Sequence, residues 1–291
     1  MRDAIYNPGL SRLKKLVSFM LLQTSHALHE RTMREIMVCV KQSYDVDSLK
    51  VDRSSGLIST LGSPKKMNDF DRNALEEGIR IREKAGGKVI AVSVGPESVK
   101  EVLKEALAIG ADTALYVSGG VPADIDSRGV AHILSKVYSL LADVDLVIMG
   151  EGSVDHYSSQ VGPRVAESLG LPALTYARSV EVSDTKVTAE RDMEGGLYVT
   201  ECPLPAVVTV VQEINQPRLP TLRSILGASK KEIRQLSLSE LGIESANVNP
   251  LVTTEEIRSP KNERKKLVLD GSKPEEASSR LVSELKKEGV L

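Results

Sequence analysis

The chain has 291 residues, and its 38 Lys and Arg nearly balance its 40 Asp and Glu, which gives a formal charge of −2 at pH 7. This charge argues against a nucleic-acid partner, and the scarcity of aromatic residues, with no Trp and two Phe, argues against a stacking platform for single strands. Cys39 and Cys202 have no metal-ligand spacing, which disfavours a zinc site or a disulfide scaffold and favours a reducing compartment such as the cytoplasm. Since no run of about 18 apolar residues is present, we expect no insertion into a membrane.

The first 32 residues differ in pattern from the rest of the chain. Residues 16–22 are mostly apolar and come after two lysines, as in a secretion signal, but the run is at the short end of the roughly 7–15 residues that such signals use. Polar and charged residues come directly after it. We therefore expect residues 1–32 to be an N-terminal extension outside the fold, with Met33 as an alternative start. A signal peptide is the remaining alternative.

After Met33, apolar strand patterns alternate with amphipathic helix patterns. The residues KVIAVSVG at 88–95 form a continuous β-branched run, and the stretch after them has apolar residues at the spacing of one helix face. We expect strands at 35–42, 88–95, 113–118 and 144–150, and helices at 71–85 (capped by Asn68 or Asp69), 98–109, 127–142 and from the loop after 150 to 169. Strands that are apolar throughout are buried on both faces, which indicates a parallel sheet. The predicted fold class is α/β, with an open, mainly parallel, Rossmann-like sheet flanked by helices.

The second half of the chain predicts a different arrangement. Residues 177–205 alternate between apolar and polar, with turn signals at Ser183-Asp184 and Gly195-Gly196, which is typical of an antiparallel hairpin. A buried strand is expected at 206–212, and a small hairpin or loop at 45–62. We divide the chain into an α/β domain at 33–214, a loop-like segment at 215–235, and an extended C-terminal arm at 236–291 that carries a short helix at about 274–287. Because the arm has little core-forming pattern, we expect it to lie on a partner.

The loop after the strand at 144–150 is the richest in potential ligands. Ligands of open parallel sheets bind beyond the carboxyl ends of the strands, where this loop is expected. Its glycines allow close approach of the backbone, and a row of polar residues leads into a helix whose free N–H groups favour an anion. The polar residues are Asp155, Tyr157, Ser158, Ser159 and Gln160. The alternative interpretation is that Ser158 or Ser159 only caps the helix.

Other chemistries lack their motifs. The dinucleotide GxGxxG after the first strand, the phosphate-binding GxxxxGK[ST] and the nucleophile-bearing GxSxG are all absent. The residues VSGGVPADIDS at 117–127 have the wrong register for a pyrophosphatase loop, and we interpret them as an ordinary loop and helix cap. Gly152 and Gly162 enclose nine residues, which partly resembles the adenine-nucleotide loop of universal stress proteins. A stand-alone nucleotide-binding regulator of that kind is therefore one hypothesis.

Several segments together resemble the electron-transfer flavoprotein β subunit. The segments span roughly residues 33–240, in the order and spacing of that family, and are MVCVKQ (37–42), MNDFDRNALEEGIRIREKAGG (67–87), AVSVGPESVKEVLKEALAIGADTA (91–114), DLVIMGEGSVDHYSSQVGP (145–163), LPAVVTVVQEINQPRLPTL (204–222) and ILGASKKEI (225–233). The resemblance implies a sheet of the adenine-nucleotide-binding type. It also implies a heterodimer with an α subunit, which carries the electron-transferring FAD and on which the C-terminal arm would pack.

Matching positions imply which residues form the nucleotide site. They are Cys39, Val40, Asn68, Asp69, Phe70, Asp71, Val94 and the loop residues Gly150, Glu151, Gly152, Ser153, Val154, Asp155, His156, Tyr157, Ser158, Ser159, Gln160 and Val161. Leu222 matches the leucine of the family's recognition loop, here 215–235, which anchors dehydrogenase partners. Its alternative is an ordinary core or loop leucine. No metal and no catalytic side chain are implied.

The choice of nucleotide depends on the branch of the family. The residues GEGSVDHYSSQVG and INQPRLPTLRSILGASKK are closer to the Fix-type branch, whose partners are quinone-linked dehydrogenases, than to mitochondrial relatives. The Fix-type resemblance implies FAD in this subunit, whereas AMP occupies the same place in mitochondrial relatives. Two flavins would permit electron bifurcation from NADH, in which the chemistry belongs to the cofactor. The alternatives are the same fold with AMP as a one-flavin carrier, and the stand-alone regulator.

Overall fold

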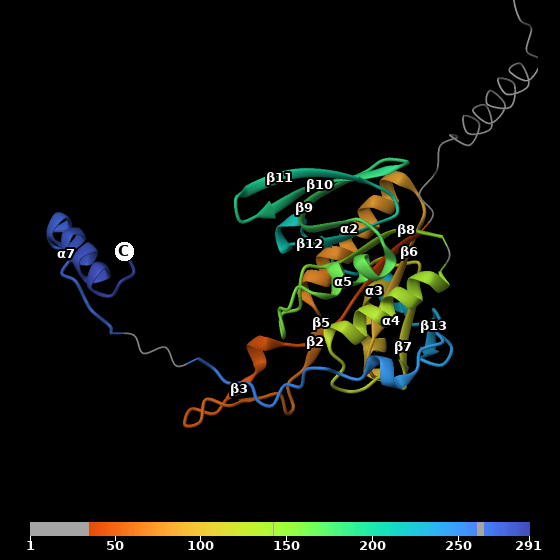
Figure 1. Cartoon of the computed structure of the whole chain (residues 1–291), viewed down its shortest axis with the longest axis horizontal. Helices are drawn as coiled ribbons and strands as arrows, with labels where there is room; N and C mark the ends of the chain where they lie inside the picture. The colour runs from red at the N-terminus through yellow and green to blue at the C-terminus, as the bar shows by residue number, and fades with distance from the viewer. Residues whose placement is uncertain (1–34, 142, 261–264) are drawn as a thin grey trace, which may run out of the picture. The chain divides into compact units, whose positions relative to one another are not determined.

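The computed structural model describes residues 35–141, 143–260 and 265–291 (Figure 1). The predicted extension at 1–32 and the alternative start at Met33 lie outside the described residues. Contacts divide the chain into two units. The first consists of the described residues up to Leu49 and of Thr60–Glu255, and the second consists of Lys50–Ser59 and Glu256–Leu291.

A single sheet runs through the first unit, and its described strands have the order β11-β10-β9-β12-β8-β1-β6-β7-β13. They are β1 (Glu35–Cys39), β6 (Lys88–Val94), β7 (Thr113–Gly119), β8 (Val144–Gly150), β9 (Ala173–Val182), β10 (Lys186–Met193), β11 (Gly196–Pro203), β12 (Ala206–Val210) and β13 (Ile233–Ser237). All neighbouring pairs are parallel except the two that involve β10. The predicted α/β class, with a mainly parallel sheet and an antiparallel hairpin, is confirmed.

Helices cover both faces of this sheet, which is why its strands are apolar throughout. The helices are α2 (Asp69–Ala85), α3 (Lys100–Ile109), α4 (Ser127–Leu140) and α5 (Val161–Leu169). Successive side chains of β1 point to opposite faces. Ile36 and Val38 therefore join a core with side chains of α2 and α3, whereas Met37 and Cys39 join a second core with side chains of α4 and α5.

The strand order reverses beside β1. The chain leaves β1 through α2 and enters β6 on one side, but it leaves β7 through α4 and enters β8 on the other side of β1. In open parallel sheets such a reversal leaves a crevice at the carboxyl ends of the two strands, where ligands bind. The loop after Gly150 begins at this edge.

Two elements were not expected in the loop-like segment 215–235. They are α6 (Leu222–Ala228) and β13, which pairs with β7 at the edge of the sheet. The side chain of Thr221 caps α6 by accepting a hydrogen bond from the Ser224 N–H at 3.1 Å, and α6 packs against α3. Residues 236–255, which the sequence assigned to the arm, also belong to the first unit.

Short elements complete the description. In the first unit, β2 (Gln42–Tyr44) pairs with β5 (Lys65–Met67), and four 3-10 turns occur at η1 (Val46–Ser48), η2 (Glu97–Val99), η3 (Gln212–Ile214) and η4 (Ser245–Val248). In the second unit, β3 (Lys50–Val51) and β4 (Ile58–Ser59) form a small hairpin, one of the two alternatives expected at 45–62, and α7 (Pro274–Lys287) is the predicted C-terminal helix. Within the described ranges, no helix is both long and apolar enough to cross a membrane.

Candidate functional site

Asp71 joins the two strands that flank the reversal. Its side chain is buried in the first turn of α2, and the carboxylate accepts hydrogen bonds from the backbone N–H of Lys41 at 2.8 Å and of Gly150 at 3.0 Å. Burial raises the pKa of this carboxyl to about 6, although the hydrogen bonds oppose the shift. One side chain therefore fixes the spacing between the ends of β1 and β8.

Asn68 holds the loop that comes after β8. It precedes α2, is fully buried, and donates its backbone N–H to the carbonyl of Lys41 at 2.9 Å. Its side-chain amide donates to the carbonyl of Gly152 at 2.9 Å and accepts from the N–H of Val154 at 3.1 Å. The asparagine thus binds the loop in the manner of a partner strand, with one donor and one acceptor.

A charge pair closes the middle of the loop. The ammonium group of Lys41 lies 2.6 Å from the carboxylate of Asp155 and 3.1 Å from the hydroxyl of Ser153, and His156 Nδ1 lies 3.2 Å from the same carboxylate. Partial burial of Asp155 would raise its pKa, but hydrogen bonds from His156 and Lys41 and the lysine charge lower it well below the ordinary range. Lys41 is absent from the predicted site. The sequence signal that could have identified Lys41 is its position directly after β1, where the strand order reverses.

An aromatic pair lies beside this loop. The Tyr157 hydroxyl donates to Glu151 at 2.6 Å, which raises the pKa of the tyrosine to about 12, and its ring lies 5.7 Å from that of Phe70 between centroids. Tyr157 and Ser159 have φ angles of 44° and 52°, in the left-handed region that non-glycine residues seldom adopt. Such strain is found preferentially at binding and catalytic sites.

The loop ends at the start of α5 with unused donors. The cap residue of α5 is Gln160, so the alternative that Ser158 or Ser159 only caps this helix is wrong. Among the described residues, the backbone N–H groups of Ser158, Ser159 and Gln160 have no hydrogen-bond acceptor. The Gln160 side-chain oxygen accepts from Ser127 at 2.9 Å and from Arg164 at 3.0 Å, which fixes the end of the loop. Free N–H groups at a helix start are suited to an anion.

The remaining predicted residues lie in three places. Cys39 and Val40 are buried at the end of β1, where burial raises the pKa of the Cys39 thiol, and Val94 is half-buried at the end of β6. Asp69 forms an ion pair with Lys66 at 3.1 Å. Leu222 lies apart from the loop on α6, and the residue is 74% exposed. The structure therefore joins the predicted residues of β1, α2 and the loop, and separates Leu222 from them.

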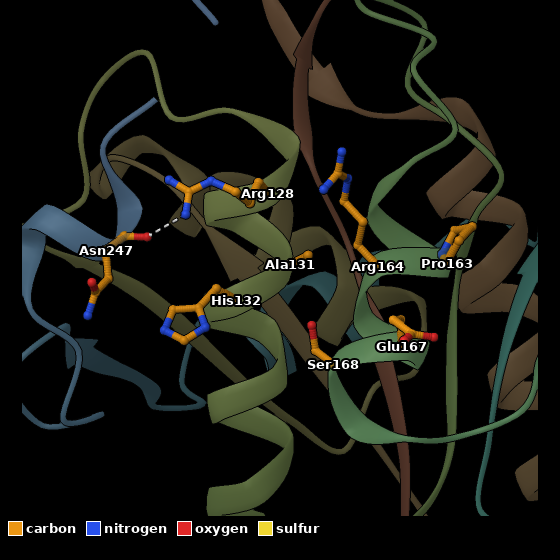
Figure 2. Close-up of a pocket in the computed structure, with 8 residues that line it drawn as sticks. All are labelled: Arg128, Ala131, His132, Pro163, Arg164, Glu167, Ser168 and Asn247. Atoms are coloured by element: carbon orange, nitrogen blue, oxygen red, sulfur yellow. Dashed lines mark hydrogen bonds between the residues drawn. The ribbon is translucent and has the colours of Figure 1, made fainter. Parts of the chain in front are cut away.

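A cavity of about 670 Å³ lies between α4 and α5 (Figure 2). It is lined by Arg128, Ala131, His132, Pro163, Arg164, Glu167, Ser168 and Asn247. The Arg128 guanidinium donates to the carbonyls of Asn247 at 3.1 Å and Asn249 at 2.8 Å, and that of Arg164 donates to Gln160. Both cations are thus engaged with the chain, and the cavity belongs to the helical layer. Among the residues that the structure describes, no cluster of His, Cys, Asp or Glu could hold a metal ion.

Comparison with known proteins gives a consistent result. The family described as "Electron transfer flavoprotein domain" matches residues 56–241. The electron transfer flavoprotein subunit beta of Thermoanaerobacterium thermosaccharolyticum is 35% identical over 264 residues, which cover 88% of this chain and 99% of the relative. That of Bacillus subtilis is 36% identical over 259 residues, with the same coverage of both chains. The caffeyl-CoA reductase-Etf complex subunit CarD of Acetobacterium woodii is 31% identical over 261 residues, again covering 88% of this chain and 99% of the relative.

Proposed function

The chain belongs to the electron transfer flavoprotein family, among the relatives of its β subunits, and we propose that it binds FAD at the rim between β1 and β8. In this role it passes electrons as a heterodimer with an α subunit, between flavin dehydrogenases and a quinone-linked acceptor. The proposal includes the bifurcating, NADH-oxidising form of the complex and a cytoplasmic location.

One observation carries the nucleotide proposal. Beyond the carboxyl ends of β1 and β8, the loop that contains Asp155, the partner of Lys41, also carries three backbone N–H groups without acceptors among the described residues. Backbone donors at a helix start and a nearby lysine are the groups that bind phosphate oxygens. The residues present therefore fit the diphosphate of an adenine dinucleotide.

The chain's own residues bind and orient the cofactor. A flavin bound here supplies the storage and transfer of electrons. Asp71 and Asn68 hold the loop and the ends of β1 and β8 in one geometry, and Lys41 provides the positive charge. The apolar carboxyl end of β1, with Cys39 at 7% and Val40 at 3% exposure, lies at the rim beside which the adenosine would bind. We assign no residue the role of acid, base or nucleophile.

The partner contacts are proposed at two further places. Leu222 is exposed on α6 and is the candidate anchor for a flavin dehydrogenase or quinone oxidoreductase. The described residues of the arm at 256–260 and 265–291 expose apolar side chains, with Val268 at 87% and Leu281 at 48% exposure, and no residue of α7 is buried. Apolar side chains that remain exposed along an amphipathic helix fit a surface that a partner covers, here the α subunit.

The test is a count of cofactors. The chain is co-expressed with its α partner, the complex is purified, and FAD and AMP are released and quantified per heterodimer. Two FAD and no AMP are expected. One FAD and one AMP would replace the proposal with a one-flavin carrier. If the chain retains ATP alone and forms no stable heterodimer, the stand-alone regulator becomes the better hypothesis.

A further inference from the structure

Helix α2 buries several polar side chains beyond its first turn. Asn73, Glu76 and Glu77 are 6%, 3% and 7% exposed. A buried carboxylate is costly unless hydrogen bonds and opposite charges compensate it. Burial raises the pKa of Glu77, although the hydrogen bond from Asn215 opposes this shift. The compensating partners of this row are Arg80 on the same helix, whose Nε lies 3.1 Å from Glu76, and groups of one distant segment, residues 212–218.

The first part of that segment is held by an exchange between two asparagines. The side-chain amide of Asn73 donates to the carbonyls of Gln212 at 3.0 Å and Asn215 at 2.8 Å. In return, the side-chain amide of Asn215 donates to the carbonyl of Asn73 and to the carboxylate of Glu77, both at 3.0 Å. These contacts fix the backbone of η3 and of the residues after it.

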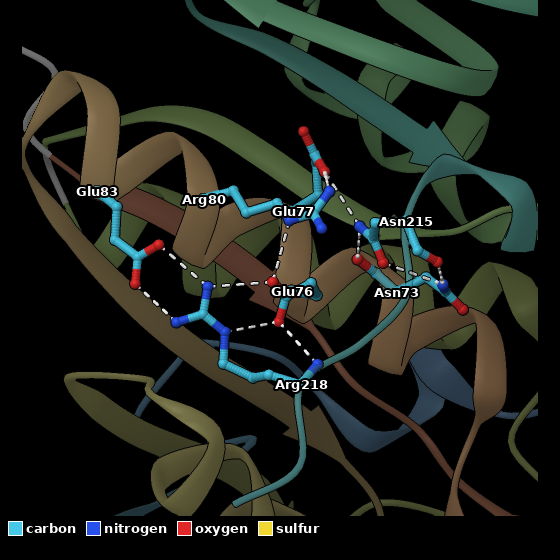
Figure 3. A network of polar contacts seen from close by, with 7 residues as sticks. All are labelled: Asn73, Glu76, Glu77, Arg80, Glu83, Asn215 and Arg218. Atoms are coloured by element: carbon cyan, nitrogen blue, oxygen red, sulfur yellow. Dashed lines mark hydrogen bonds and ion pairs between the residues drawn. The ribbon is translucent and has the colours of Figure 1, made fainter.

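The second part is held by Arg218, which lies between two carboxylates of α2 (Figure 3). Its Nε and Nη2 atoms donate to the two oxygens of Glu76 at 2.8 and 3.0 Å, and its Nη1 and Nη2 atoms donate to Glu83 at 2.7 and 3.0 Å. The backbone N–H of Arg218 also donates to Glu76, at 3.1 Å. Two bidentate pairs and a backbone bond hold one residue in a single orientation.

An exposed apolar surface comes directly after this residue. Leu219, Leu222 and Leu226 are 82%, 74% and 60% exposed, and we call residues 219–226 the docking segment. The segment is therefore anchored on its N-terminal side by Arg218 and on its C-terminal side by Ala228, which is buried where α6 meets α3.

The same helix anchors the loop at residues 150–161, which we call the nucleotide loop. Asn68 and Asp71, at the start of α2, bind Gly152, Val154 and Gly150. A second connection runs through the sheet, because the N–H of Glu151 donates to the carbonyl of Val210 at 3.0 Å, two residues before η3. The nucleotide loop and the segment 212–218 are thus bound to the same two elements, α2 and the end of β12.

We propose that Arg218 is a positioning residue that fixes the docking segment to the nucleotide-binding helix, so that nucleotide binding at the rim also orders the docking segment. The inference rests on the proposed nucleotide function, and it adds a link between cofactor occupancy and the surface offered to the dehydrogenase. Ordering of the loop by a ligand restricts α2 and β12, and the segment held by both loses motion with them.

The test is hydrogen–deuterium exchange of the full chain, freed of nucleotide and then loaded with AMP or with FAD. In the wild type, each nucleotide is expected to slow exchange in residues 150–161 and also in residues 212–226. In Arg218→Gln the slowing at 150–161 remains, whereas that at 212–226 falls by roughly threefold or more. A merely structural role for Arg218 would speed exchange at 212–226 equally with and without nucleotide.

Two further variants keep the outcome decisive. Arg223→Gln removes the same charge from α6, where the described chain gives Arg223 no hydrogen bond or ion pair, and it should retain both responses. If Arg218→Gln does not fold, Arg218→Lys replaces it, because lysine keeps the positive charge but cannot form the bidentate pairs with Glu76 and Glu83. Two outcomes overturn this inference but leave the proposed function standing. In the first, the nucleotide response at 212–226 survives loss of the Arg218 contacts. In the second, residues 150–161 respond to nucleotide in the wild type but residues 212–226 do not. No response at 150–161 to either nucleotide overturns the proposed function as well.

Discussion

Lys41 Nζ lies 2.6 Å from Asp155 Oδ1, and this pair connects the end of β1 with the middle of the nucleotide loop. The lysine side chain is 41% exposed and that of the aspartate 12%, so the pair faces solvent on one side. Surface pairs contribute little stability, and we therefore assign this one to geometry and charge placement. At the proposed phosphate site, an incoming phosphate would share this half-exposed ammonium group with Asp155.

Replacing Lys41 by glutamine should weaken AMP binding about tenfold, since a charge-assisted hydrogen bond contributes about 1.5–3 kcal/mol. The loss should depend on salt, because the attraction between an exposed ammonium and a phosphate is screened. Titration calorimetry at low and high KCl gives the measurement. Wild-type affinity is expected to fall with KCl while that of the variant changes less. Equal salt dependence in the two proteins would place Lys41 away from the phosphate.

The double variant Asp155→Ala with Gln160→Ala should weaken nucleotide retention by about tenfold or more, because the middle and the end of the loop then lose charge-assisted contacts. The sheet should stay folded, since the side chains of Asp155 and Gln160 have no partners among the described residues beyond the rim itself, where they contact Lys41, Ser153, His156, Ser127 and Arg164. Bound nucleotide per chain and circular dichroism report the two properties. Glu167→Ala with Ser168→Ala, farther along α5, is the matched control. Unchanged affinity in the double variant would show that the site is misplaced.

Asp71 predicts how stability depends on pH. Its pKa in the folded chain is about 6, above the ordinary value of 3.8, so the folded state holds the proton more tightly than the unfolded state. The stabilisation from that proton is complete below about pH 4 and is lost as pH rises towards 6. Relative to Asp71→Asn, which mimics the protonated side chain, the wild-type free energy of unfolding should fall by up to about 3 kcal/mol between pH 3.5 and 7. A difference that is constant or rises over this range would contradict the assignment.

Much of the sheet was predictable because its strands carry their own signal. The strands at 88–95 and 144–150 are apolar on both faces, and α2 was displaced from its predicted start by only two residues. The polar residues Asn68 and Asp71 lie at the predicted start of α2, so this part of the site could be predicted from the sequence. The predicted cap before α4 is also present, since Asp126 accepts a hydrogen bond from the Gly129 N–H at 2.8 Å.

The parts that were not predictable depend on distant contacts. In β13 only Leu236 is buried, so this edge strand lacks the apolar run of a central one. Arg218 and Glu76 stand 142 positions apart, and an acidic face on a helix normally indicates solvent rather than a buried clamp. The role of Lys41 was ambiguous for the same reason, because a lysine directly after a strand usually points into solvent. Only the tertiary structure decides which charges are paired.

Two glycines offer a matched test of packing at α5 and α6. A Cβ added to Gly162 would lie 2.3 Å from Thr209 Cγ2, so α5 packs on β12 with no room for a methyl group. Gly162→Ala should therefore destabilise the fold by about 1–3 kcal/mol. Gly227 is helical with open space around it, and Gly227→Ala should stabilise by up to about 1 kcal/mol through helix propensity. Urea unfolding of both variants is the measurement, and equal effects would contradict the close contact at Gly162.

Leu222→Ala separates docking from folding. Because Leu222 is 74% exposed, truncation should move the thermal midpoint by less than about 2 °C, as surface substitutions do. If Leu222 anchors the dehydrogenase, truncation should raise the KM for that partner about tenfold, the usual scale for an apolar anchor, and leave cofactor content and kcat nearly unchanged. Val199 on β11 is 73% exposed, and Val199→Ala is the control for loss of an exposed apolar group elsewhere. The measurement is the rate at which the dehydrogenase that reduces the wild-type complex reduces each variant, over a range of its concentrations. A KM that stays at the wild-type value in Leu222→Ala, or rises equally in both variants, would remove Leu222 from the partner surface and leave the nucleotide site untouched.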